Sequence, residues 1–213
     1  IKVYDGVGLV VKEGPNYEVK ITTSDHIIDD LDIKRNGKML IVQDHSTCNI
    51  ARDYGQTTVF VTIPDGTILP LIQELELHCK TEQKIRSEGV LHSPIIRLFS
   101  IGDDGDGAGT GDFHLSIDNG QFVVESNNVS NFYITGQTEN LHVFFSWGNG
   151  IFYGENLIAN AITFYHRGSN DVILFPINSI SGEIYSTGNV VLKNNPNLPP
   201  TVIQHFRGRL IMN

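Results

Sequence analysis

The chain has 213 residues, of which 40% are hydrophobic and 18% are charged, a composition that favours a folded domain over a disordered segment. Its 24 acidic residues outnumber its 15 Lys and Arg residues, and the formal net charge of -9 argues against a surface that binds nucleic acid by neutralising phosphates. No apolar run reaches the roughly 18 to 20 residues that a membrane-spanning helix needs.

The first 64 residues contain four segments with the character of β-strands. They are short apolar or alternating runs bounded by Gly, Pro, Asn or Asp, at residues 6–14, 17–24, 38–44 and 57–64, as expected of strands. We expect these strands to pair and to cap one end of the molecule. The chain begins at Ile1 without a methionine, which is consistent with an exported protein whose signal has been removed.

Residues 70–85 can be interpreted as a helix or as a strand. Leu71, Leu75 and Cys79 follow a helical spacing, whereas Leu75, Leu77 and Cys79 alternate as they would along a strand. We favour the strand. Cys48 and Cys79 are the only cysteines, and both a disulfide bond and two buried thiols remain open. Without a C-x-x-C motif, a thiolate zinc site is not expected.

A glycine-rich segment at residues 99–117 carries four aspartates, Asp103, Asp104, Asp106 and Asp112. Calcium favours several carboxylate oxygens on a flexible turn. The spacing nevertheless fits neither the twelve-residue calcium loop nor the calcium-binding nonapeptide repeat. We therefore expect a solvated turn region and no metal.

The second half contains a repeat with a step of about 20 residues. Segments beginning at Phe122, His142, Ile162 and Gly182 align into columns. The apolar column comprises Val124, Phe144, Phe164 and Ile184. The mostly aromatic column comprises Glu125, Phe145, Tyr165 and Tyr185. A polar column comprises Ser126, Ser146, His166 and Ser186, and a corner column comprises Asn128, Gly148, Gly168 and Gly188.

These columns predict a parallel solenoid, because one repeat is too short to bury a face and must stack on its neighbours. The apolar column would point inward, and the corner residues would take backbone angles that glycine, and to a lesser extent Asn128, tolerates. An antiparallel sandwich of hairpins would explain the strands but not the columns. We therefore predict an all-β fold, a solenoid with about 20 residues per coil.

The aromatic column suggests a binding surface. Because it alternates with the apolar column, its rings should face outward. Phe145, Trp147, Tyr165 and Tyr185 would then form a strip able to bind a glycan or a protein. The alternative is that the N-terminal strands or a second protomer cover the strip.

Catalytic residues and cofactors are not expected. No column holds two carboxylates in adjacent complete rungs, and His166, flanked by Ser146 and Ser186, lacks an orienting carboxylate. His45 and His92 have no partners at metal spacing.

Several segments carry a resemblance to a known family. They are "YDGVGLVVKEGPNYEVKI" from Tyr4, "DDLDIKRNGKMLIV" from Asp29, "GAGTGDFHLSI" from Gly107, "YHRGSNDVILFP" from Tyr165, "ISGEIYSTGNVVLKNNP" from Ile180 and "VIQHFRGRLI" from Val202. Together they resemble the putative auto-transporter adhesin, head GIN domain family. The "SGAGDI"-like turn that recurs in that family is kept clearly once in this chain.

The resemblance implies a right-handed parallel β-helix of the pectate-lyase type in an exported or envelope protein of Bacteroidetes-like bacteria, with adhesion as its role and no catalytic residues. We expect one domain, with N-terminal strands over residues 1–64, β-helix rungs over 65–196 and a closing strand over 197–213. The expected function is binding at the periplasm, cell surface or extracellular space. The alternatives are a carbohydrate-active enzyme on a β-helix frame and a structural module that forms homo-oligomers.

Overall fold

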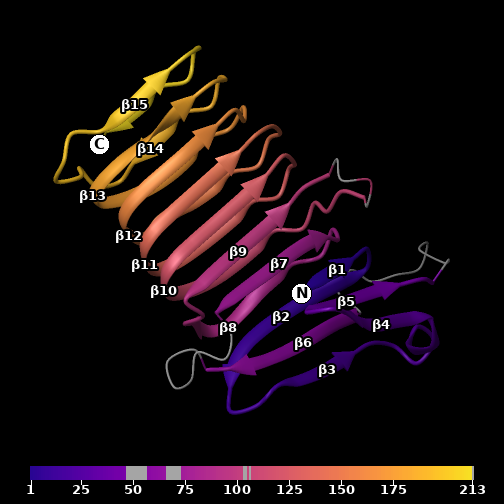
Figure 1. Cartoon of the computed structure of the whole chain (residues 1–213). Coiled ribbons are helices and arrows are strands. Elements are labelled where there is room, and N and C mark those ends of the chain that lie inside the picture. Colours follow the sequence, from indigo (N-terminus) through magenta and orange to yellow (C-terminus); the bar gives the residue numbers. More distant parts are fainter. Residues whose placement is uncertain (47–56, 66–72, 103–104, 106, 213) are drawn as a thin grey trace.

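The computed structural model describes residues 1–46, 57–65, 73–102, 105 and 107–212. Over these residues the protein consists of strands and one 3-10 turn, η1, at Ile28–Asp30. The strands form a single 16-stranded sheet in which most pairs are parallel (Figure 1). The all-β expectation is therefore confirmed. In this part of the chain, no helix is long and apolar enough to cross a membrane.

All four predicted N-terminal segments are strands, and the first and fourth of the six strands here were not among them. The six are β1 Lys2–Tyr4, β2 Val7–Gly14, β3 Glu18–Thr22, β4 Leu31–Asn36, β5 Met39–Asp44 and β6 Thr57–Pro64. The next three are β7 Glu74–Lys80, β8 Ile85–Leu91 and β9 Ile95–Ser100. Residues 74–80 are thus a strand, as favoured, because Leu75, Leu77 and Cys79 all point into the core.

Four long strands make up the centre of the molecule: β10 Phe113–Ser126, β11 Phe132–Phe145, β12 Phe152–His166 and β13 Val172–Ile184. Each pairs in parallel with the next along most of its length. The first half of β10 pairs with β8 and its second half pairs with β9. The chain therefore crosses two faces in each repeat. Face A contains β2, β6, β8 and the first halves of the long strands, whereas face B contains β7, β9 and the second halves.

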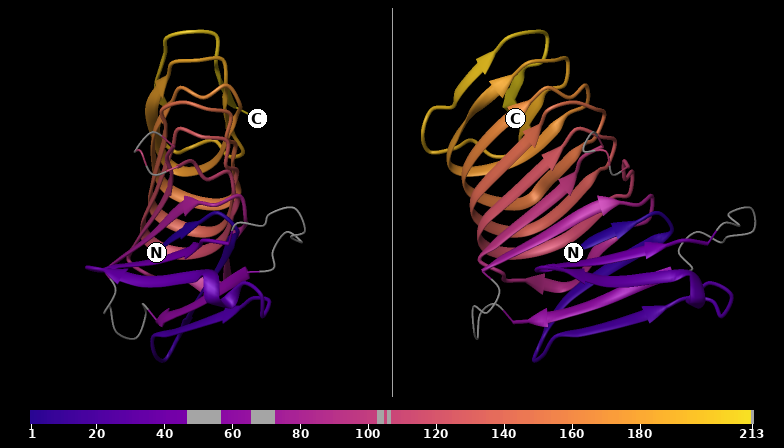
Figure 2. Two further views of the ribbon diagram at one scale, coloured as in Figure 1. Left: turned by 90° about the vertical axis from the view of Figure 1, so that its right-hand side faces the viewer. Right: turned by 45° about the vertical axis from the view of Figure 1, so that its right-hand side comes forward.

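The two ends of the stack differ. At the C-terminal end, β14 Val190–Leu192 and β16 Leu210–Met212 extend face A, and β15 Thr201–Gln204 extends face B. At the N-terminal end, β3 pairs with β6 and β4 pairs with β5. These are the two antiparallel pairs among the described strands. Figure 2 shows the strands stacked along one long axis, with β3 and β4 at the opposite end from β15.

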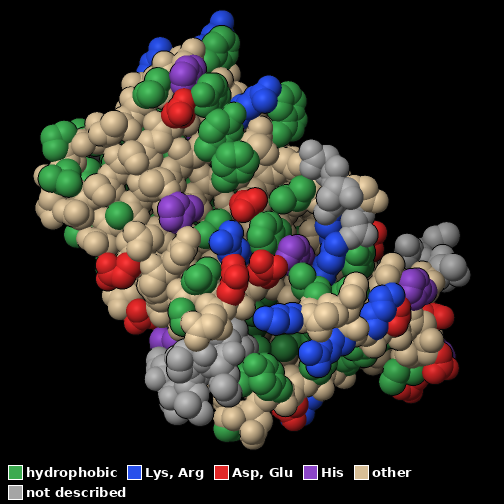
Figure 3. Space-filling model, viewed as in Figure 1, with side chains coloured by type: hydrophobic (Ala, Val, Ile, Leu, Met, Phe, Trp, Pro, Cys, Tyr) green, Lys and Arg blue, Asp and Glu red, His purple; other side chains and the backbone are tan. Residues whose placement is uncertain are grey.

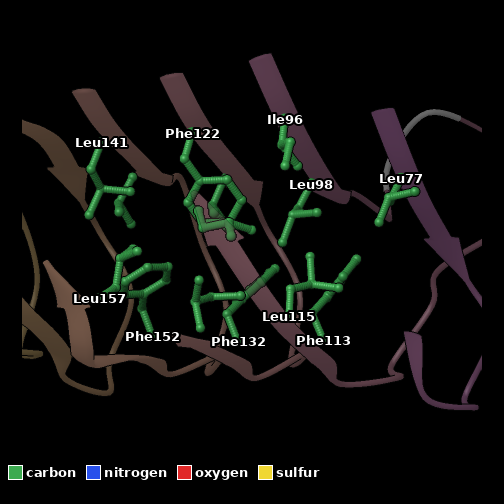
Figure 4. Close-up of a cluster of buried hydrophobic side chains, with 14 of the residues drawn as sticks. Leu77, Ile96, Leu98, Phe113, Leu115, Phe122, Phe132, Leu141, Phe152 and Leu157 are labelled. Atoms are coloured by element: carbon green, nitrogen blue, oxygen red, sulfur yellow. The ribbon is translucent and has the colours of Figure 1, made fainter. Parts of the chain in front are cut away.

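The core lies between the two faces and is built from rows of equivalent side chains. Phe113, Phe132 and Phe152 are fully buried on face A, and the Phe113 and Phe132 rings stack with centroids 5.0 Å apart. Phe122 and Leu141 lie opposite them on face B (Figure 4). Each such side chain contributes roughly 1.5–3 kcal/mol by leaving water, so the stack is held mainly by its interior rows.

The register differs from the fixed 20-residue alignment by one position from β10 to β11 and from β11 to β12, and by two positions from β12 to β13, where His166 pairs with Ile184. Val124 pairs with Val143, and Val143 pairs with Phe164. The step from β10 to β11 is thus one residue shorter than 20, and a register shift after Tyr153 lengthens the step to β12. Phe144, predicted to point inward, is instead 44% exposed. The remaining apolar predictions, Val124, Phe164 and Ile184, are buried.

The same shift changes the predicted polar column. Ser126, Phe145 and His166 pair in register and are all buried. Ser146 and Ser186 lie in the turns that follow β11 and β13, so the predicted ladder of Ser146, His166 and Ser186 does not form.

The turn after β11 needs glycine for two reasons, whereas the other predicted corner glycines, Gly168 and Gly188, do not have positive φ. Gly148 has a φ of 91°, and a Cβ there would lie 2.2 Å from the carbonyl oxygen of Asn128. Backbone therefore stacks on backbone without room for a side chain. The expectation that Asn128 takes the left-handed region is wrong, because every described residue with positive φ is a glycine. The Asn128 side chain instead donates a hydrogen bond to the carbonyl of Gly109.

Cys79 is a free, buried thiol whose Sγ donates to the carbonyl of Thr81 at 3.3 Å. Burial raises the pKa of this thiol, so it stays protonated and unreactive at neutral pH. Cys48 lies outside the described residues.

Candidate functional site

A row of stacked rings runs along the outer side of face B. Phe144 stacks on Tyr165 with ring centroids 4.8 Å apart, and Tyr185 stacks on His205 at 4.0 Å. The rings of Tyr165 and Tyr185 are 5.0 Å apart and tilted by 34°. We call these four residues the aromatic strip. The rings come from the ends of β11 and β12 and from the residues that directly follow β13 and β15. Parallel strands repeat at about 4.8 Å, which sets the spacing for face-to-face stacking.

A carboxylate fixes the C-terminal end of the strip. The Tyr185 hydroxyl donates to Glu183 Oε2 at 2.6 Å, and His205 Nε2 lies 2.8 Å from the same oxygen. The hydrogen bond from Tyr185, together with that from His205, lowers the pKa of Glu183. The same bond raises the pKa of Tyr185. The strip therefore combines apolar ring edges with an anchored anion at one end.

Two ring–arginine pairs flank the strip. Trp147 is 62% exposed, and the Arg167 guanidinium lies 5.1 Å from its ring centroid. Arg207 lies 5.5 Å from the ring of Phe206, which is 55% exposed. Such cation–π pairs hold the arginines over apolar surface. Figure 3 shows green side chains gathered over the C-terminal half of this face, with blue side chains beside them.

The structure places the sequence-predicted site residues as follows. Tyr165 and Tyr185 are adjacent in the strip, as predicted. Trp147 lies beside the strip, in the turn after β11, and pairs with Arg167. Phe145 was predicted on the outer surface, but it is 1% exposed and packs against Phe132 inside the core. The one-residue shift in register is the physical reason, because a shift of one residue reverses the face.

Phe144, His205, Glu183 and Arg167 were not identified from the sequence. A signal for Phe144 existed, because the aromatic pair Phe113–His114 aligns with Phe132–Tyr133 at a step of 19, not 20. A signal for His205 also existed, because His205 lies one further step of 20 after Tyr185, as Gly208 does after Gly188.

A second ring ladder, on the outside of face A, shows that stacking alone does not mark a binding site. His114, Tyr133 and Tyr153 stack at 4.5 Å and 4.6 Å. All three are half-buried, and the ladder lacks an exposed flanking ring. Stacked rings on the outside therefore also stabilise neighbouring rungs. The aromatic strip on face B differs because its rings are more exposed and charged side chains contact it or lie beside it.

A cluster of ionisable groups lies at the other end of the molecule. Glu13, Asp65 and His92 have ligand atoms within 4.8 Å of one another. The expectation that His92 has no such partners is therefore wrong, because distant strands bring them together. Glu13 Oε1 accepts the backbone N–H of His92 at 2.6 Å, and Oε2 lies 2.8 Å from its ring Nδ1. Both oxygens of Glu13 thus fasten the turn after β8 to the end of β2.

Other candidate groups also serve the fold. Asp112 accepts hydrogen bonds from the backbone and side chain of Asn131, while Asp103, Asp104 and Asp106 lie outside the described residues. His166 is fully buried, its two ring nitrogens have no hydrogen-bond partner, and burial lowers its pKa. It is a neutral core residue and not a base that faces a substrate.

Comparisons with known proteins identify a family and a fold. Residues 1–196 match the family described as "Putative auto-transporter adhesin, head GIN domain". No curated protein matches the sequence.

Solved structures share the fold. A putative adhesin from Bacteroides fragilis is 15% identical with a TM-score of 0.77, covering 100% of this chain and 91% of that one. A putative lipid binding protein from Parabacteroides distasonis is 10% identical with a TM-score of 0.57, covering 99% and 91%. A putative adhesin from Parabacteroides merdae is 11% identical with a TM-score of 0.55, covering 100% and 90%.

Proposed function

The chain belongs to the putative auto-transporter adhesin, head GIN domain family, and from this premise we propose that it is a non-catalytic, exported envelope or surface protein that binds a protein ligand through the aromatic strip. Two of the proteins of known structure that share its fold are putative adhesins, which supports a surface role. The observation that carries the proposal is the exposed strip with its anchored carboxylate and flanking arginines.

The geometry of the strip favours a protein ligand over a glycan. Sugars usually stack on an open ring face, but Tyr165 and Tyr185 already cover each other and their neighbours at 4.0–5.0 Å. The exposed face of Trp147 is shared with Arg167. The strip therefore offers ring edges, a hydroxyl, a carboxylate and arginines. Aromatic residues and Arg are the types enriched at protein interfaces.

An enzyme that cleaves sugars is not supported by the carboxylates of the strip. Glu125 pairs in register with Phe144, and Glu183 pairs with Tyr165. The two carboxylates are thus three strands apart, roughly 14 Å at about 4.8 Å per strand. Glycoside hydrolysis uses carboxyl groups about 5 to 9.5 Å apart. No second function is therefore proposed for this surface.

We further infer that the stack is a right-handed parallel β-helix of the pectate-lyase type. The parallel pairs that repeat at about 20 residues support this inference, as does the family. Within it, residues 1–64 would form the N-terminal strands and cap, 65–196 the rungs and 197–213 the closing strand. The strip would then extend from the rungs into the closing segment.

Binding to a panel of immobilised extracellular proteins, with a glycan array in parallel, tests the proposed function. We expect the protein to bind a panel protein, and the triple variant Phe144→Ser, Trp147→Ser, Tyr185→Ser to lose at least about tenfold in affinity because hot-spot aromatics dominate interfaces. Ile158→Ser is the matched control, since Ile158 is 47% exposed but outside the strip. Unchanged binding by the triple variant, or binding to glycans alone, would contradict the proposal.

A further inference from the structure

A cavity of about 1030 Å³ opens at the N-terminal end of the stack, far from the aromatic strip. It lies between β3 and β6 on one side and β4, β5 and β7 on the other. Figure 1 shows these two groups of strands diverging at this end. The volume is at the upper end of the roughly 300–1,000 Å³ typical of small-molecule sites.

The inner wall of the cavity is apolar because the two faces of the core are not closed here. Val19 pairs directly with Val61 in the antiparallel ladder, so both side chains point to the same side of the sheet. Val61 is 5% exposed and belongs to the core, yet Val19 on the same side is 45% exposed. Ile63, Leu40 and Leu75 continue this apolar lining. Val19 and Leu40 therefore expose apolar surface at this end, beside the buried side chains of Val61, Ile63 and Leu75.

The acidic and the basic side chains around the cavity differ in whether they have ion-pair partners. Its three acidic residues each have a partner: Glu18 with Lys20, Glu74 with Arg97, and Glu76 with the ring of His78.

Two cations that line the same cavity, Arg35 and Lys38, have no acidic partner among the described residues. Arg35 pairs with Leu40 across the ladder, which places its side chain on the inner side of β4. The Arg35 Nε donates only to the carbonyl of Gly37, at 2.7 Å, and the rest of its guanidinium is open to a ligand. Figure 3 shows blue side chains beside green ones over this part of the molecule.

We propose that this cavity binds an amphiphile with one apolar chain and an anionic head group, such as a fatty acid carboxylate. The chain lies along Val19, Val61 and Leu75, and the head group pairs with Arg35 and Lys38. An apolar interior favours the chain by removing it from water, and a guanidinium binds a carboxylate with two parallel hydrogen bonds. The cavity and the aromatic strip are separate surfaces, so this inference does not depend on the proposed function.

Calorimetric titration with three twelve-carbon ligands below their micelle concentrations tests both parts of the proposal. We expect dodecanoate to bind at least about tenfold more tightly than dodecyltrimethylammonium, with dodecanol in between, because only the carboxylate pairs with the two cations. Equal affinities for the anionic and cationic ligands, or no binding of dodecanoate, would overturn the proposal.

Two variants separate head-group recognition from chain burial. The double variant Arg35→Glu, Lys38→Glu is expected to weaken dodecanoate binding at least about tenfold and to reverse the preference between the two charged ligands. Its control, Lys84→Glu, Lys193→Glu, changes the net charge equally at exposed sites outside the cavity and should bind as the unmodified protein does. If both double variants weaken binding alike, the effect is general electrostatics and the site is wrong.

Val19→Asp tests the apolar wall. The side chain is largely exposed on an end strand, so the fold should tolerate the change, as an unaltered unfolding midpoint would verify. The new carboxylate lies where the apolar chain is placed, and dodecanol binding should fall at least about tenfold. Retained dodecanol binding in a folded Val19→Asp protein would refute the placement of the chain.

Discussion

Replacing Phe145 with alanine is the sharpest test of how the rungs are aligned. The ring is 1% exposed, and it packs against Phe132 at 5.6 Å and His166 at 6.2 Å between ring centroids. Removing a fully buried phenylalanine costs about 3–5 kcal/mol, because the lost transfer free energy adds to that of the cavity left behind. For a protein of this size, about 2–4 °C per kcal/mol converts this to a fall in Tm of roughly 6–20 °C.

Phe144→Ala is the matched control, since the two phenylalanines are adjacent in sequence and point in opposite directions. Phe144 is 44% exposed and loses mainly its stack on Tyr165, worth about 0.5–1.5 kcal/mol. Urea unfolding followed by circular dichroism measures both free energies of unfolding. A Phe144→Ala protein that is destabilised more than the Phe145→Ala protein would show that Phe144 is the interior residue and that the register described above is wrong.

Three further predictions concern the turns, the core and the strip. Gly148→Ala should lower the free energy of unfolding, measured in urea, by more than Gly89→Ala does. Both glycines have positive φ, and placing an alanine in that conformation costs about 1–2 kcal/mol. Only at Gly148 would the new Cβ also clash with a neighbouring backbone. Burial lowers the pKa of His166 below 6.5, so the unfolded state binds more protons, and the free energy of unfolding should fall as the pH drops below about 6.5. His166→Phe should reduce this fall. An unchanged dependence of the free energy of unfolding on pH in the variant would refute a neutral buried ring. Tyr185→Phe removes the main cause of the low pKa of Glu183 and should raise that pKa in an NMR titration; no change would mean that the hydrogen bond is not made in solution.

Local chemistry in the sequence was sufficient for four of the six N-terminal strands but not for the register of the stack. Thr57–Pro64 is bounded in the structure as its apolar run predicts, and Glu74–Lys80 alternates as a strand does. The repeat also predicted rungs of the right length. The steps along face B are 19, 21 and 18 residues, because the strands pair with irregularities, and an alignment at a fixed step of 20 hides these differences.

The candidate sites were predictable only in part, for the same reason. Tyr165 and Tyr185 are in contact as expected, although Tyr165 pairs in register with Glu183 and Tyr185 follows the end of β13. The contact between Glu13 and His92 joins residues 79 apart, and no sequence spacing indicates it. The cavity at the N-terminal end depends on where two antiparallel strands stop covering the core, which is a tertiary feature.

Covalent footprinting of the aromatic side chains, with and without the bound protein ligand, tests the central claim most directly. If the aromatic strip is the binding surface, Phe144, Trp147 and Tyr185 should each lose several-fold in reactivity on binding. Tyr17, which is 64% exposed at the far end of the molecule, should not change. Protection of Tyr17 with unchanged reactivity in the strip would place the ligand elsewhere and contradict the account.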